Sequence, residues 1–132
     1  MPNRANLSQH FELRVPALLA QIHAAEAKVG LSFPKEYVDF LLITNGLNST
    51  GCLALHEIEV LPERNIEYEV QKYFPGYFMI GDDSGGQAIL INAAGEVFEV
   101  GMGVTNPKFL ERSADSLTDL LVKLKGLTLG ER

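Results

Sequence analysis

The chain has few of the residues that mark a secreted or membrane-spanning protein. Its 132 residues include a single cysteine, Cys52, so no internal disulfide can form, which indicates a reducing compartment. No apolar run approaches the ~20 residues that cross a bilayer. The polar start, from Met1 to Asn6, adjoins no apolar core of a signal peptide. We therefore expect a cytoplasmic protein with no membrane segment.

Positive charge is also scarce. The chain has 11 Lys and Arg residues against 17 Asp and Glu residues, a net charge of −6, and no three basic residues are adjacent. Binding to nucleic acid depends on clustered Lys and Arg side chains that contact phosphates. The composition therefore argues against nucleic acid as a partner.

The acidic residues are concentrated in one stretch. Five glutamates lie within thirteen positions, and Arg64 is the one basic residue among them: Glu57, Glu59, Glu63, Glu67 and Glu69. Two interpretations stay open, a solvated face that aids solubility or a negative patch that steers a basic partner. Asp82 and Asp83 extend this patch if the glycine turn that contains them lies beside it.

The periodicity predicts one α+β domain in which helices cover an antiparallel sheet. Helices are expected over 16–29, 34–44, 61–73 and 116–125, and strands over 52–55, 77–81, 87–91 and 96–100, with a polar loop at 47–51 and an extended segment at 58–60. The buried stripe of the first helix is Leu18, Leu19, Ile22, Ala25 and Val29, and the inner face of the third is Ile66, Val70 and Tyr73. The domain spans 1–132, with a core at about 16–125 and flexible ends at about 1–7 and 127–132. The expected core residues are Leu19, Ile22, Phe33, Tyr37, Phe40, Leu41, Phe78, Ile80, Ile89, Val97, Leu117, Leu120 and Leu121.

No motif predicts catalysis, a cofactor or a metal. The loop Asp83-Ser84-Gly85-Gly86 resembles a protease nucleophile loop, but none of the three histidines stands in the context of a base, and a serine without a base is unreactive. The sequence that follows Asp82 lacks the alternating oxygen ligands of a calcium-binding loop. We expect a non-enzymatic protein with no catalytic, cofactor-binding or metal-binding residues. The rival hypothesis is a small hydrolase that uses Ser84 or the Asp82 and Asp83 pair.

Several motifs, in order, resemble the SUKH superfamily, and most of all its Smi/Knr branch, named for a yeast cell-wall synthesis regulator. They are Gly30-Leu-Ser-Phe-Pro34-Lys-Glu-Tyr37 with Phe40-Leu41 and Asn45-Gly46, then Phe78-Met-Ile80-Gly81-Asp-Asp83-x-Gly85-Gly86, Gly95-Glu-Val97-Phe98, and Ala114-Asp-Ser116-Leu117-x-x-Leu120-Leu121. The chain departs from the family pattern at Leu47 and Asn92, both expected in loops.

The resemblance implies an α+β domain without known catalytic activity. It also implies a protein-binding role, because bacterial members are mostly immunity proteins that neutralise a toxin and eukaryotic members are interaction modules in signalling. The partner would then be a protein, and a basic toxin domain such as a nuclease is one candidate. The alternative is a regulatory or scaffold module. The proposed interface residues are Glu57, Glu59, Glu63, Glu67, Glu69, Asp82 and Asp83.

Overall fold

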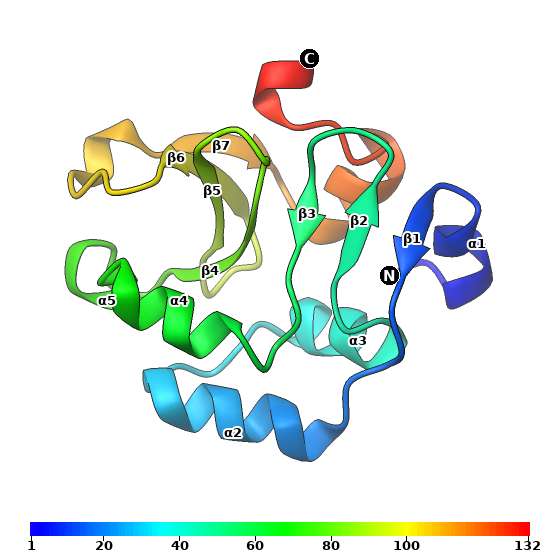
Figure 1. Cartoon of the computed structure of the whole chain (residues 1–132), viewed down its shortest axis with the longest axis horizontal. Helices are drawn as coiled ribbons and strands as arrows, with labels where there is room; N and C mark the ends of the chain where they lie inside the picture. The colour runs from blue at the N-terminus through cyan, green and yellow to red at the C-terminus, as the bar shows by residue number, and fades with distance from the viewer.

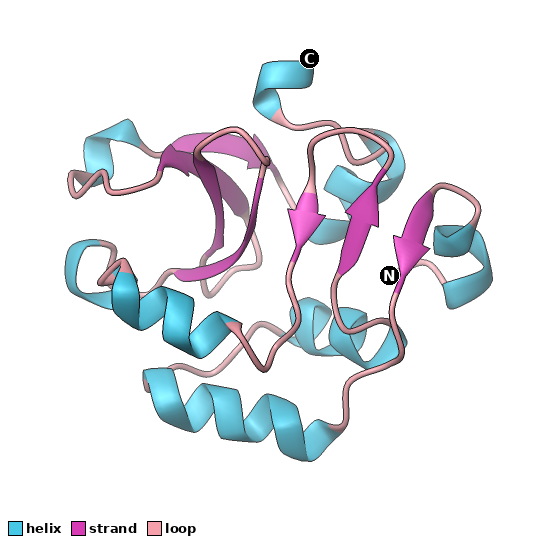
Figure 2. Ribbon diagram, viewed as in Figure 1, coloured by secondary structure: helices cyan, strands magenta, loops and turns pink.

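A computed structural model of the whole chain shows a single α+β domain built on one antiparallel sheet of seven strands (Figures 1 and 2). The strands are β1 (Phe11–Leu13), β2 (Leu47–Ser49), β3 (Ala54–Leu55), β4 (Phe78–Asp82), β5 (Gln87–Ile91), β6 (Val97–Gly101) and β7 (Glu111–Ala114). The α-helices are α1 (Arg4–Ser8), α2 (Leu19–Val29), α3 (Lys35–Ile43), α4 (Leu61–Glu67) and α5 (Val70–Tyr73). A π-helix at Asp119–Lys123 and 3₁₀ turns at Pro107–Phe109 and Leu129–Glu131 complete the chain. No helix in the protein combines the length and apolar character that a bilayer crossing requires.

The spatial order of the strands is their order in the sequence, and every neighbouring pair is antiparallel. The meander predicted from the three central strands is confirmed, with register partners such as Ile91 with Phe78 and with Val97. Figure 1 shows β4 to β7 curling away from β1 to β3, with α2, α3 and α4 grouped on one side.

The central strands bury both faces. In β5, Ile89 and Ile91 belong to the large core cluster under the helices, while Ala88 and Leu90 belong to a smaller cluster with Val70 of α5. Successive side chains in a strand point to opposite faces, so the sheet separates two apolar layers. The expected core residues are buried, with Leu19 as the one exception.

Leu19 is 48% exposed because α2 begins later than predicted. The Ala17 N–H donates to the carbonyl oxygen of Leu41 at 2.9 Å, which holds the chain after Pro16 in an extended conformation. Gln21 Oε1 then accepts a hydrogen bond from the Leu18 N–H at 2.7 Å at the start of the helix. The first turn of α2 therefore projects beyond the core, and only Ile22 and Ala25 of the predicted stripe are fully buried.

The predicted helix over 61–73 is wrong as one unit, because it is broken into α4 and α5. Glu69 adopts a left-handed conformation with φ of 51°, which a regular helix cannot contain. Ile66, expected on the inner face, is exposed, and Asn65 takes the inner position.

Three strands were not predicted, and the reason is their length and polarity. β1 and β2 have three residues each, too few to show a period, and β2 lies in a stretch that reads as a polar loop. β7 starts with Glu111 and Arg112, and it forms one edge of the sheet while β1 forms the other. Short and charged edge strands are typical of natural sheets. The segment 58–60, predicted to be extended, is a turn.

The closing helix begins as predicted, since the Asp119 N–H donates to Ser116 Oγ at 3.0 Å. Most of its length is π-helical, which sequence periodicity did not indicate. It ends at Lys123, two residues before the predicted end. The chain then turns at Gly126, whose φ is 73° and whose α-carbon lies so close to the ring of Phe11 that a Cβ would collide with it.

Both ends of the chain are hydrogen-bonded to the rest of the domain. Arg4 Nη1 donates to the carbonyl oxygens of Arg14 at 2.8 Å and Ile43 at 2.7 Å. At the other end, the Leu129 N–H donates to the buried carboxylate of Glu99 at 2.9 Å. The flexibility of residues 1–7 and 127–132 stays a prediction.

Candidate functional site

Asn45, just after α3, holds the segment that leads from β3 into α4. Its Oδ1 accepts a hydrogen bond from the Ile58 N–H at 2.9 Å, and its Nδ2 donates to Glu59 Oε1 at 2.7 Å. The Asn45 residue is buried, which strengthens both hydrogen bonds. Asn45 thereby fixes the turn at the start of the acidic stretch and orients the carboxylate of Glu59.

Gly46 lets the backbone pass close to β3. Its φ is 86°, and a Cβ at this position would collide with the carbonyl oxygen of Leu55 and approach the guanidinium of Arg14. Only glycine meets both conditions without strain. The Asn45-Gly46 pair that indicates a helix stop in the sequence therefore also positions the acidic segment.

Asn65 decides which side of α4 faces solvent. Its Nδ2 donates to the carbonyl oxygen of Met79 at 3.0 Å, and its Oδ1 accepts from the Met79 N–H at 2.8 Å. This buried amide fastens α4 to β4. At 100° per residue, Glu63 and Glu67 lie on nearly the opposite side of the helix from Asn65, and both are exposed.

Four of the predicted glutamates line two adjoining surface hollows beside α2. The first, of about 530 Å³, is lined by Glu59, Glu63 and Glu67 together with Lys28, Pro62 and Ile66. The second, of about 340 Å³, is lined by Glu57 and Glu59 together with Arg14, Val15, Pro16, Leu18, Gln21 and Asn45. Glu59 borders both hollows. We call this surface the α2–α4 groove.

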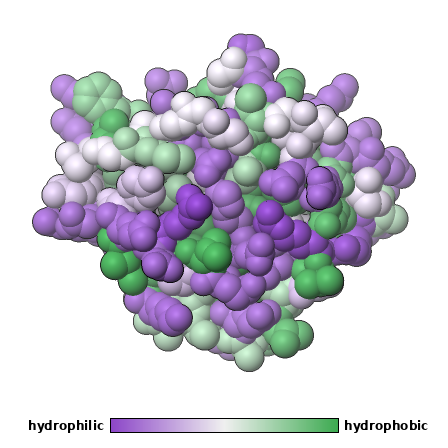
Figure 3. Space-filling view, in the orientation of Figure 1, coloured by the Kyte–Doolittle hydropathy of each residue, from purple (hydrophilic) through white to green (hydrophobic).

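The charges in the α2–α4 groove are mostly unpaired. Glu57 forms an ion pair with Arg14 Nε at 3.7 Å, while Glu59, Glu63 and Glu67 form none. Figure 3 shows this face of the molecule, where separate hydrophobic groups interrupt a hydrophilic surface over α2 and α4. The surface is acidic, with exposed apolar side chains along its length.

The other three predicted interface residues lie outside the groove lining. Glu69 pairs with Lys72 at 3.2 Å at the start of α5. Asp82 accepts a hydrogen bond from His56 Nε2 at 2.7 Å and is only 13% exposed. Asp83 Oδ1 accepts from the N–H groups of Gly85 and Gln87 and closes its own turn.

Ser84 is not placed for nucleophilic chemistry. Its hydroxyl donates to the carbonyl oxygen of Cys52 at 2.9 Å, while His56 is bonded to Asp82. A serine nucleophile needs a hydrogen-bonded base. The Asp82 and Asp83 carboxylates are engaged in turn and ion-pair contacts, so this loop is built as a structural turn.

Three groups away from the α2–α4 groove, Cys52, Glu131 and Tyr37, have shifted pKa values. The Glu131 carboxylate raises the pKa of the exposed Cys52 thiol by its negative charge, and the Thr128 N–H lowers the pKa of Glu131 by donating to it. Burial raises the pKa of the Tyr37 hydroxyl, which has no hydrogen-bond partner. No three His, Cys, Asp or Glu side chains meet in an arrangement that could hold a metal ion.

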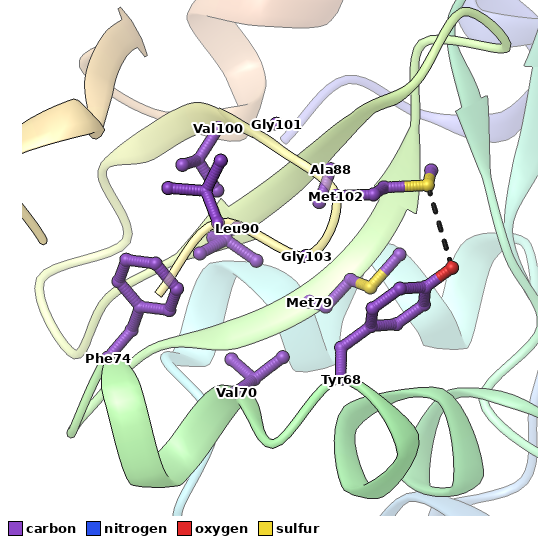
Figure 4. A pocket seen from close by; sticks show the side chains of 11 residues that line it. Tyr68, Val70, Phe74, Met79, Ala88, Leu90, Val100, Gly101, Met102 and Gly103 are labelled. Atoms are coloured by element: carbon purple, nitrogen blue, oxygen red, sulfur yellow. Dashed lines mark hydrogen bonds between the residues drawn. The ribbon is translucent and has the colours of Figure 1, made fainter. Parts of the chain in front are cut away.

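A third hollow, away from the α2–α4 groove, is apolar and very small. Figure 4 shows side chains of α5, β4, β5 and β6 converging on a space of about 20 Å³, closed by Tyr68, whose hydroxyl lies 3.7 Å from Met102 Sδ. That volume corresponds to about one water molecule. The hollow is a packing gap between the sheet and α5, too small for a metabolite.

Sequence reasoning missed the non-acidic half of the groove. Leu18 and Ile66 were expected on buried helix faces, and Lys28 off the buried face of the first helix. Arg14 and Val15 lie in a segment for which a short helix and an irregular arm were both left open. The late start of α2 leaves Leu18 exposed, and the inward placement of Asn65 turns the neighbouring Ile66 toward solvent. Only the three-dimensional placement of α2 beside α4 brings them to the same surface as the glutamates.

Comparison with known proteins points to one family. Residues 16–123 match the model of the SMI1 / KNR4 family (SUKH-1). A protein of Bacillus subtilis (strain 168), described as "Uncharacterized protein YnaB", is 32% identical over 80 residues. The match covers 61% of this chain and 54% of that protein, so the chain matches about half the length of this curated relative.

Proposed function

Because the chain belongs to the SMI1 / KNR4 family (SUKH-1), we propose that it is a cytoplasmic immunity protein that binds and neutralises a cognate bacterial toxin. SUKH family domains are generally non-catalytic binding modules. The observation that carries the proposal is the row of exposed carboxylates on Glu59, Glu63 and Glu67, which have no cation partner within the domain. Unpaired charge on a surface favours a partner of opposite charge.

The expected partner is a basic toxin domain, such as a nuclease whose cleft binds phosphates. An acidic inhibitor complements that cleft, which accelerates association and disfavours wrong partners. Glu57, Glu59, Glu63 and Glu67 form the centre of the proposed interface. Glu69, Asp82 and Asp83 form its margin, because their carboxylates already have partners within the chain.

The test begins with the genes beside this one: where one of them encodes a secreted toxin, that toxin is co-expressed with the chain. We expect the wild-type chain to restore growth, and the double variant Glu63→Lys and Glu67→Lys to lose most of that protection. The matched control is Glu12→Lys with Glu111→Lys, which reverses two exposed carboxylates that also lack ion pairs and lie outside the groove.

Binding of the purified toxin to the chain should weaken as salt rises, because exposed charges are screened. If the wild-type chain gave no protection and no neighbouring toxin gene existed, the immunity proposal would fail. A regulatory or scaffold module of the cell-wall-regulator type would then be the better account. A small hydrolase is the least supported alternative, given the contacts of Ser84.

A further inference from the structure

The α2–α4 groove has a defined direction and length. α2 and α4 pack side by side and run the same way in Figure 1, and the two hollows follow one another along α2, from Leu18 near its start to Lys28 near its end. α2 has 11 residues, so at 1.5 Å per residue it is about 16 Å long. An extended peptide covers that distance in about five residues.

Apolar side chains lie at both ends of the α2–α4 groove. Val15 is 76% exposed and Leu18 is 67% exposed, and both line the hollow at the start of α2. Ile66 is 61% exposed and lines the hollow at the other end. Scattered exposed apolar residues are ordinary, but these three share one continuous surface. Covering them would release hydration water and favour binding.

Carboxylates lie between these apolar ends. Glu59 stands where the two hollows meet and is held there by Asn45, and Glu63 stands one turn further along on α4. Neither has an ion-pair partner, and the cations on the rim are Arg14, which pairs with Glu57, and Lys28. Along the groove, Val15 and Leu18 therefore come first, Glu59 and Glu63 follow, and Ile66 lies at the far end beside Glu67.

We propose that the α2–α4 groove binds a short cationic segment of a protein partner, with Lys or Arg in its middle and an apolar side chain at each end. The inference rests on the proposed function, since it specifies the partner chemistry of the same surface. The apolar ends supply most of the affinity as anchors, and the carboxylates set register and association rate.

The experiment titrates the full ¹⁵N-labelled chain with the peptide acetyl-Leu-Lys-Arg-Lys-Arg-Leu-amide, followed by amide chemical shifts. Two control peptides replace both Leu residues with Ser, or all four basic residues with Glu. We expect saturable shifts at the amides of Leu18, Glu59, Glu63 and Ile66. The peptide with Ser at both ends should bind about tenfold or more weakly than the Leu-ended peptide. A tenfold change in Kd corresponds to about 1.4 kcal/mol of binding free energy.

A matched pair of protein variants distinguishes specific binding at the apolar ends of the groove from nonspecific hydrophobic binding. Ile66→Ser should weaken binding of the Leu-ended peptide severalfold, whereas Val122→Ser, at an exposed apolar residue outside the groove, should leave it unchanged. Three results would overturn the inference. They are a Ser-ended peptide that binds as tightly as the Leu-ended one, chemical shift changes at Glu12 and Glu111 as large as those in the groove, and the lack of saturable binding. The titration contains no toxin, so its failure leaves the protection assay untouched, and failure of that assay leaves the peptide result standing.

Discussion

The carboxylate of Glu36, in the first turn of α3, accepts a hydrogen bond from the backbone N–H of Leu117 at 2.8 Å. Its second oxygen accepts from the Thr118 hydroxyl at 2.7 Å. One side chain thereby joins the starts of two helices that are far apart in the sequence. It also satisfies a backbone N–H that the first turn of a helix leaves free.

Replacing Glu36 should therefore destabilise the domain. Glu36→Ala removes both hydrogen bonds and leaves the partly buried Leu117 N–H without a partner, so we expect a loss of about 1–2 kcal/mol in the free energy of unfolding. Urea denaturation measures it. Glu63→Ala is the control and should change stability by less than about 0.5 kcal/mol, because that side chain is exposed and makes no contact of this kind. Equal effects of the two changes would refute the role of Glu36.

Glycine should matter far more at position 46 than at position 76. Both residues have positive φ, 86° and 83°, but a Cβ at Gly76 meets no atom within 4 Å, while one at Gly46 collides with the Leu55 carbonyl. Gly76→Ala should cost roughly 1–2 kcal/mol from strain alone. Gly46→Ala should cost about 1–3 kcal/mol more because of overpacking. Thermal unfolding of the two variants in parallel would show the difference, and similar midpoints would contradict it.

The Tyr37 hydroxyl is buried without a partner, so its removal should not harm the fold. Tyr37→Phe keeps the ring among Phe33, Phe40 and Phe78. We expect the free energy of unfolding to rise by up to about 1 kcal/mol, because a buried hydroxyl without a hydrogen bond is unfavourable. A loss of stability in urea denaturation would show that the hydroxyl has a partner in solution.

Tyr37 should also make the fold sensitive to alkali. Its pKa is raised in the folded state, so the unfolded chain loses this proton first, at a pH near 10. The free energy of unfolding is therefore unaffected by this group below about pH 10, and it falls as the pH rises above that value. Comparing urea midpoints of the wild type and Tyr37→Phe between neutral pH and pH 11 tests this, and the variant should lose less stability over that interval.

Cys52 should react slowly with alkylating reagents despite its exposure. The charge of Glu131 raises the thiol pKa, which lowers the fraction of reactive thiolate near neutral pH. Glu131→Gln removes the charge but keeps a carbonyl acceptor for the Thr128 N–H. Iodoacetamide labelling followed by mass spectrometry should then be faster near pH 8, with its pH midpoint shifted down. Unchanged labelling would show that Glu131 does not control the thiol.

The parts of the fold that could be predicted are those in which one physical signal dominates. The apolar runs at Phe78 and Ile89 bury both faces of a strand, and the Pro34 to Leu41 segment combines a helix start with a buried aromatic stripe, so these elements were confirmed nearly to the residue. The same residues carry the family resemblance, which the family match also confirms.

The unpredicted parts depend on contacts between distant residues. The start of α2 depends on a hydrogen bond from Ala17 to Leu41, and the inner face of α4 depends on the Asn65 amide and Met79. Neither contact has a local sequence signature. The acidic residues of the candidate site could be identified from their clustering in the sequence. Their apolar neighbours could not, because helix periodicity assigned Leu18 and Ile66 to buried faces.

The chain-order arrangement of the seven strands has a consequence for how the protein folds. From β2 onward, each strand pairs with the strand that precedes it. The β1–β2 pairing spans α2 and α3, the β3–β4 pairing spans α4 and α5, and the other four pairings cross no α-helix. Pairings that are close in sequence lower the entropic cost of loop closure and speed folding. The sheet can therefore grow strand by strand as the chain leaves the ribosome, with the N-terminal edge and its helices already complete when β4 appears.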